Sequence, residues 1–177
     1  MVTRNLEPMY NVKMALEAFG VVKERHPGAR LDIVGSGAQE AELKRWVAEK
    51  GLEDVFFAGA VPNEEIARFL QAADILLNPS NVDNMPISLL EAFAFGVPVI
   101  STRVGGIPDL VGEEKAALLV EPGDYLRMAE KISELVKEPE KAKRLTAHAK
   151  DLCKDFTWDS VRSRLLEVYY PAGGKVA

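Results

Sequence analysis

The sequence has little of several residue types on which common functions depend. Cys153 is the only cysteine among 177 residues, so no internal disulfide can form. Without a His and Asn constellation nearby, we expect its thiol to be packed or idle rather than catalytic. His26 and His148 are the only histidines, and both lie in polar stretches, which argues against a metal site. We therefore expect no metal and no other cofactor.

A basic excess and a long apolar run are also missing. The formal net charge is −5, which argues against a nucleic-acid partner, because proteins that bind nucleic acid normally present a basic face. An anionic ligand must then be held by local groups. No apolar run approaches the ~20 residues of a transmembrane helix, and the first residues lack the apolar core of a signal peptide. We expect a single domain located in the cytoplasm. Peripheral contact with a membrane stays an open alternative for a longer protein that contains this domain.

Short apolar segments alternate with longer amphipathic ones. The short segments are rich in Val, Ile, Leu or Phe and are bounded by Gly, Pro, Asn or Ser, so each predicts a buried strand. These strands are expected at 31–34, 55–58, 75–77, 97–100 and 118–120. Helices are expected at 11–25 with Asn11 as N-cap, at 39–50, from 63 with Asn63 as cap, and at 86–95 with Pro86 in the first turn and Gly96 at the end.

This alternation predicts a doubly wound parallel α/β sheet, Rossmann-like, with helices on both faces. After residue 124 only helices are expected, at 125–137, 139–156 and 158–170. Only residues 1–3 precede Arg4, where a first strand should already be ending, so we expect the sequence to begin inside a larger protein. Ligands of such sheets bind at the carboxyl ends of the strands.

The segment 78–102 combines a strand end, a polar loop and a helix start. A helix N-terminus exposes free N–H groups and a partial positive charge, so it attracts phosphate, and Ile87 and Ser88 are placed to donate two such groups. Asp83 lies ahead of the helix, and Glu91 lies ~7–8 Å further along its axis. Both carboxylates suit the hydroxyls of a nucleotide-sugar. The alternative, that Asp83 caps the helix and Glu91 pairs with a base, stays open.

A family resemblance is carried by the same segment. Asp83 and Glu91 are separated by seven residues and followed by AFAFGVPVIST and by Gly105 and Gly106. This pattern resembles the E-x7-E signature of the family 4 retaining glycosyltransferases, which have the GT-B fold. Weaker similarities lie at 34–37 and 55–80. The resemblance implies the nucleotide-sugar-binding C-terminal domain of such an enzyme, with the N-terminal acceptor domain absent, and retaining transfer of a hexose to a saccharide or lipid-linked acceptor.

The resemblance also implies roles for individual residues. Glu91 holds the ribose hydroxyls, Asp83 contacts the hexose, the backbone around 85–88 takes the diphosphate, Val61 lies by the base, and Arg4 clamps the diphosphate as the first of two basic residues. Arg4 and Asp83 are the expected catalytic residues. The expected donor site comprises Arg4, Gly35, Gly37, Val61, Asp83, Asn84, Met85, Pro86, Ile87, Ser88 and Glu91.

Two departures from the family pattern bear on function. The second basic residue has no clear match, because Met9 or Tyr10 stands in its place and Lys13 lies too far into the helix. Pro86 removes one N–H from the phosphate cradle. These departures keep two alternatives open, a nucleotide-sugar-binding module without turnover and a GT-B sugar-nucleotide epimerase.

A dinucleotide site is disfavoured by the glycine pattern. Gly35 and Gly37 would need a third glycine at position 40, which is Glu40. We instead expect both glycines to form a strand-to-helix turn that requires positive φ.

Overall fold

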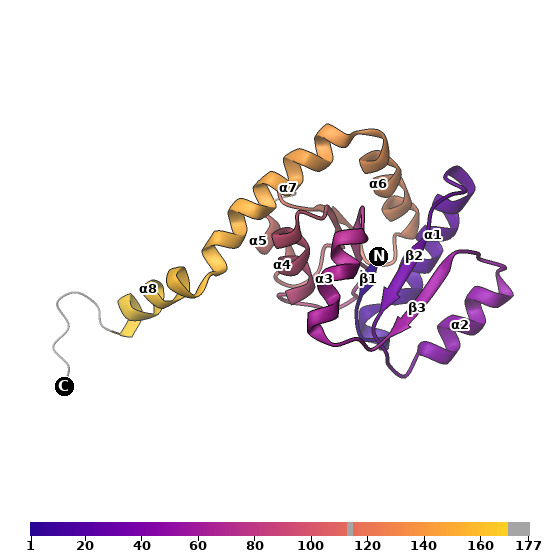
Figure 1. Ribbon diagram of the computed structural model, residues 1–177, viewed down its shortest axis with the longest axis horizontal. Coiled ribbons are helices and arrows are strands. Elements are labelled where there is room, and N and C mark those ends of the chain that lie inside the picture. Colours follow the sequence, from indigo (N-terminus) through magenta and orange to yellow (C-terminus); the bar gives the residue numbers. More distant parts are fainter. Residues whose placement is uncertain (113–114, 170–177) are drawn as a thin grey trace.

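The computed structural model describes residues 1–112 and 115–169, in which parallel strands alternate with helices (Figure 1). The strands are β1 (Val2–Thr3), β2 (Leu31–Val34), β3 (Val55–Gly59), β4 (Leu76–Asn78), β5 (Val99–Thr102) and β6 (Leu118–Val120). The α-helices are α1 (Val12–Arg25), α2 (Glu40–Glu49), α3 (Asn63–Ala72), α4 (Ile87–Phe95), α5 (Ile107–Val111), α6 (Tyr125–Lys137), α7 (Pro139–Cys153) and α8 (Trp158–Tyr169). Two 3-10 turns are η1 (Pro8–Tyr10) and η2 (Lys154–Phe156).

The sheet has the predicted doubly wound, parallel topology. One ladder has the order β1-β2-β3 and another the order β4-β5-β6. The two ladders meet where β1 lies against β4, and the Leu77 N–H donates to the Met1 carbonyl over 2.9 Å. The strand order across both is therefore 3-2-1-4-5-6, and it reverses between β1 and β4. Crevices at such a reversal are where ligands bind in sheets of this kind.

The strands bury side chains on both faces. Leu77 and Ile100 belong to one apolar cluster, whereas Leu76 and Val99 belong to a second. Because successive side chains of a strand point to opposite faces, the two clusters lie on opposite sides of the sheet. Helices α1 and α6 cover the first face, and α3, α4 and α5 cover the second.

Several helix starts differ from the prediction. Asn11 holds the N-cap position of α1 but has a left-handed backbone, and its side chain donates to Asn81 Oδ1 instead of capping the helix. Asn63 is the first helical residue of α3, after Pro62. Pro86 is the N-cap of α4, with extended backbone, so the first-turn N–H groups begin at Ile87. The prediction that Pro86 lies in the first turn is therefore wrong, because it precedes that turn.

Other boundaries shift for local reasons. The strand expected at 97–100 begins at Val99, because Pro98 has no N–H to donate to the ladder. The helix expected at 139–156 ends at Cys153 and continues as η2. Cys153 packs against the second cluster, and burial raises the pKa of its thiol.

The last helix stands apart from the sheet. Figure 1 shows α7 running along the second half of the domain and α8 extending beyond it. None of the residues of α8 is buried, and Trp158 and Tyr169 are among its exposed apolar side chains. Across the described residues, no helix combines the length and apolarity required to span a bilayer.

Candidate functional site

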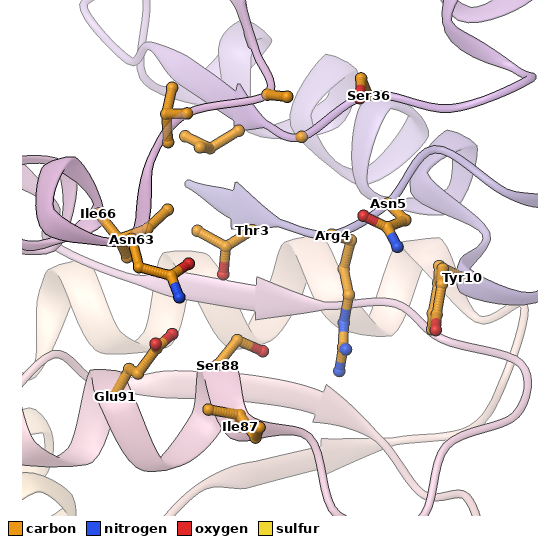
Figure 2. Close-up of a pocket in the computed structure, with 14 residues that line it drawn as sticks. Thr3, Arg4, Asn5, Tyr10, Ser36, Asn63, Ile66, Ile87, Ser88 and Glu91 are labelled. Carbon is orange, nitrogen blue, oxygen red and sulfur yellow. The ribbon is translucent and has the colours of Figure 1, made fainter.

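A cavity of about 470 Å³ opens beside the point where the strand order reverses (Figure 2). Its walls are the segments that follow β1, β2 and β3, together with the first turns of α3 and α4. Parallel strands present their carboxyl ends at one edge, so residues distant in sequence meet there. The lining residues are Thr3, Arg4, Asn5, Tyr10, Val34, Gly35, Ser36, Ala60, Val61, Asn63, Ile66, Ile87, Ser88 and Glu91.

Gly35 and Gly37 bring the turn after β2 onto the chain after β1. The φ of Gly35 is +141°, and a Cβ there would lie 1.9 Å from the carbonyl oxygen of Arg4. A Cβ at Gly37 would lie 2.6 Å from the carbonyl oxygen of Leu6. The prediction of positive φ is therefore confirmed for Gly35 and wrong for Gly37. At Gly37 a glycine is needed only because a side chain would overlap with Leu6. Gly35 lines the cavity, whereas Gly37 is not among its lining residues.

Arg4 is held on several sides. Its Nη2 donates to Asp83 Oδ2 over 2.5 Å, and its Nε donates to Asn78 Oδ1 over 2.8 Å. The Tyr10 ring centroid lies 5.1 Å from the guanidinium carbon. Burial lowers the pKa of Arg4, while the Asp83 carboxylate and Tyr10 oppose this effect. Because arginine starts from so high a pKa, the group stays a cation at neutral pH.

Asp83 is part of the Arg4 environment rather than of the cavity wall. Its Oδ2 binds Arg4, and its Oδ1 accepts the Asn84 N–H over 2.9 Å. The N-cap of α4 is Pro86, and no described side chain caps the helix there, so the alternative in which Asp83 is a helix cap is wrong. The carboxylate that was predicted to contact the hexose is therefore paired with Arg4 in this structure.

Glu91 is half-buried on α4 and faces the cavity. Within residues 1–112 and 115–169, no group hydrogen-bonds to its carboxylate or pairs with it, so the alternative in which it pairs with a base is wrong there. Ile87 and Ser88 also line the cavity. The Leu89 N–H donates to the Pro86 carbonyl, whereas the two preceding N–H groups lack a partner among the described residues.

Of the remaining predicted residues, Val61 lines the cavity, whereas three others lie outside its wall. Asn84, Met85 and Pro86 form the loop ahead of α4, and the first two are exposed. A Cβ at Gly105 would lie 1.9 Å from the Asp83 carbonyl oxygen, and one at Gly106 would lie 2.6 Å from Asn84 Oδ1. The two glycines thus allow the turn after β5 to pack directly on this loop.

The second cation is not supplied by Lys13. Its Nζ lies 6.0 Å from the Trp46 ring, and its side chain is exposed on α1, outside the cavity. Tyr10 occupies the wall beside Arg4 instead (Figure 2). Among the described residues that line the cavity, Arg4 is the single basic side chain.

Several lining residues were not among the predicted site residues, and two of them, Asn63 and Thr3, are polar groups deep in the site. Asn63, expected to be a cap, points into the cavity from α3 toward Glu91 (Figure 2). Thr3 lies at the end of β1, and its buried hydroxyl oxygen has no hydrogen-bond partner in the part of the chain that the structure describes. No local pattern marks either residue, because both reach the site through the arrangement of the sheet. No group of three or more possible metal ligands occurs in the described ranges.

Comparison with known proteins gives the fold and the family. The C-terminal domain of a group 1 glycosyl transferase, LpcC of Francisella tularensis, superposes with a TM-score of 0.78 at 22% identity, covering 86% of this chain and 83% of that one. Anabaena HepE in complex with UDP superposes with a TM-score of 0.85 at 20% identity, covering 97% and 49%. Both likenesses concern the fold, which is that of GT-B C-terminal domains.

The relatives in sequence are glycosyltransferases. The amylovoran biosynthesis glycosyltransferase AmsK of Erwinia amylovora is 37% identical over 123 residues, which are 66% of this chain and 30% of that protein. The 2-deoxystreptamine N-acetyl-D-glucosaminyltransferase of Streptomyces fradiae is 34% identical over 153 residues, or 85% and 36%. The chain thus spans about a third of the length of these relatives. The protein family described as "Glycosyl transferases group 1" matches residues 1–152, and the chain belongs to this family.

Proposed function

We propose that this chain binds the nucleotide-sugar donor of a retaining family 4 hexosyltransferase. One observation carries the proposal: a single cavity holds a guanidinium together with a carboxylate and helix N–H groups that have no partner among the described residues. Figure 2 shows Glu91, Ser88 and Arg4 in that order along the cavity. In this order, Glu91 would bind the ribose, the N–H groups at Ser88 would bind the diphosphate, and Arg4 would balance the diphosphate charge. Val61, on the wall beside α3, is then placed near the base.

The chemistry follows from this placement. Cleavage of the bond between sugar and diphosphate leaves negative charge on the diphosphate, and fixed donors aimed at it lower the barrier. The guanidinium of Arg4 and the N–H groups of Ile87 and Ser88 are such donors. Asp83, next to Arg4, is assigned to the hexose. The acceptor, a saccharide or a lipid-linked sugar, is assigned to a further domain, because the relatives are about three times as long.

A second candidate is a nucleotide-sugar-binding module without turnover. The observation in its favour is that Arg4 provides the single cationic side chain among the described lining residues. Both functions predict donor binding, and they differ in whether a longer protein containing this domain transfers sugar.

Calorimetry with nucleoside diphosphates tests the shared part. We expect UDP, GDP or ADP to bind more tightly than its parent nucleoside. Arg4→Ala should weaken diphosphate binding by roughly tenfold to a hundredfold, as for loss of a charged hydrogen-bond partner, and leave nucleoside binding unchanged. Arg45→Ala, on the exposed face of α2, is the matched control. If none of the three diphosphates binds, the proposal fails.

An activity assay tests the division of labour. The 177-residue chain with UDP-glucose or UDP-N-acetylglucosamine and simple saccharide acceptors should show binding and no transfer. Turnover by this chain alone would contradict the assignment of the acceptor to another domain.

A further inference from the structure

Four polar side chains are buried where β4 and β5 end. The exposed fraction of Asn78 is 1%, and that of Ser80, Ser101 and Thr102 is 0%. Uncompensated polar groups in an apolar interior are costly, so such a cluster is expected to be fully hydrogen-bonded. The hydroxyl of Thr102 donates to the Ser80 carbonyl over 2.6 Å, which ties the two strand ends together.

Hydrogen bonding determines which way the Asn78 amide points. Arg4 Nε can only donate, so the Asn78 oxygen must face it, and the two atoms are 2.8 Å apart. The amide nitrogen then faces Ser101, which is its register partner on β5, and donates to the hydroxyl over 2.8 Å. That hydroxyl donates its single proton to the Thr102 carbonyl, so it can only accept from Asn78, which sets the amide orientation independently of Arg4. Ser80 adds a second donor to the Asn78 oxygen over 2.9 Å.

The guanidinium of Arg4 is consequently held at two different nitrogens. Asn78 binds Nε from inside the sheet, and Asp83 binds Nη2 from the loop after β4. Two bonds to separate nitrogens of a planar group define its plane. Of its five N–H donors, three remain for a ligand. The Asn78 contact is the rigid one, because Asn78 belongs to a central strand whereas Asp83 lies in a loop.

We propose that Asn78 is a positioning residue for Arg4, with its amide orientation set by Ser101. The inference rests on the proposed function, in which Arg4 binds the diphosphate. A side chain that is ordered before binding loses less conformational freedom when the ligand arrives. Asn78 thereby raises affinity for the diphosphate without touching it.

Asn78→Ala tests this assignment by calorimetry. We expect affinity for UDP to fall about three- to tenfold, in line with the cost of ordering one flexible side chain, and affinity for uridine to stay unchanged. In an Arg4→Ala background, the same substitution should have no further effect on UDP. Thr102→Val is the matched control, because it removes a buried hydroxyl of the same cluster without removing the bond to Arg4.

A second variant and a ligand-free measurement complete the test. Ser101→Ala keeps the amide but frees its orientation, so a smaller loss in the same direction is expected if Asn78→Ala does not fold. In nuclear magnetic resonance spectra, the Arg4 Nε–H signal should exchange slowly with solvent in the unsubstituted chain and rapidly in both variants. Slow exchange in both, or an equal loss of UDP and uridine affinity, would overturn the inference. Absence of UDP binding by the unsubstituted chain would instead count against the proposed function.

Discussion

Arg4 and Asp83, 79 residues apart, form an ion pair of 2.5 Å between Nη2 and Oδ2, with both side chains 12% exposed. The pair joins the loop after β1 to the loop after β4 across the reversal of the sheet. Because the carboxylate lies on the cation assigned to the diphosphate, it competes with that ligand for the same positive charge. This competition predicts that removing the Asp83 charge increases affinity for the diphosphate.

Asp83→Asn should increase affinity for UDP, by roughly threefold to tenfold, since like-charge repulsion of ~1 kcal/mol is removed while an acceptor for Nη2 is kept. UDP has no hexose, so its affinity reports this competition alone. The gain should shrink at high salt. Asp159→Asn, which removes the same charge from α8, controls for net charge. An unchanged or lower affinity in calorimetry would show that Asp83 serves Arg4 mainly as a support.

Glu91→Gln should weaken UDP binding by about 1–3 kcal/mol, the range for a charged hydrogen-bond partner. The free energy of unfolding should not change, because no described group depends on the carboxylate. For 2′,3′-dideoxy-UDP, which lacks the hydroxyls assigned to Glu91, the two proteins should bind alike. Glu49→Gln on α2 is the control. Equal UDP affinities together with lowered stability in urea would make Glu91 a structural residue.

Gly105→Ala and Gly51→Ala separate backbone strain from steric overlap. Both glycines have positive φ, +50° and +58°, but a Cβ at Gly105 would meet the Asp83 carbonyl at 1.9 Å, whereas nothing lies within 4 Å at Gly51. We expect Gly51→Ala to cost about 1 kcal/mol of stability. Gly105→Ala should cost a further ~1–3 kcal/mol and weaken UDP binding, because the loop that leads into the N-terminus of α4 must move. Urea unfolding measures both losses, and equal losses would mean that the loop yields freely.

The stability of the 177-residue chain should rise between pH 6 and pH 8. Burial lowers the pKa of the Met1 amine to about 6 from 8.0, against the raising effect of Asp32 and Asp74, and the amine donates to the Ile75 carbonyl over 2.7 Å. The unfolded chain binds more protons in this interval, so unfolding becomes harder as pH rises, by at most about 3 kcal/mol. Urea unfolding at the two pH values measures it. Acetylation of the amine should remove the difference, and a difference that survives acetylation would contradict the assignment to Met1.

Most of the fold could be predicted from the sequence because the signals are local. Short apolar runs between turn residues marked five strands, and the alternation with helical periodicity gave the parallel topology. The short helix α5 was missed, since five residues are too few to show a helical period. The prediction that the Asn11 side chain caps α1 was wrong for a different reason. That side chain hydrogen-bonds to Asn81, 70 positions away.

What the sequence by itself determined was the family and several of the segments that line the cavity. Gly35, Val61 and Glu91 were all placed there, because motif spacing and strand ends are properties of consecutive residues. Only the tertiary structure decided how those segments meet. The pairing of Arg4 with Asp83, and the orientation of Asn78 by Ser101, depend on the order and register of strands, which bring together residues 79 and 23 positions apart. Such contacts leave no local pattern, because their energy depends on a partner that the neighbouring residues do not specify.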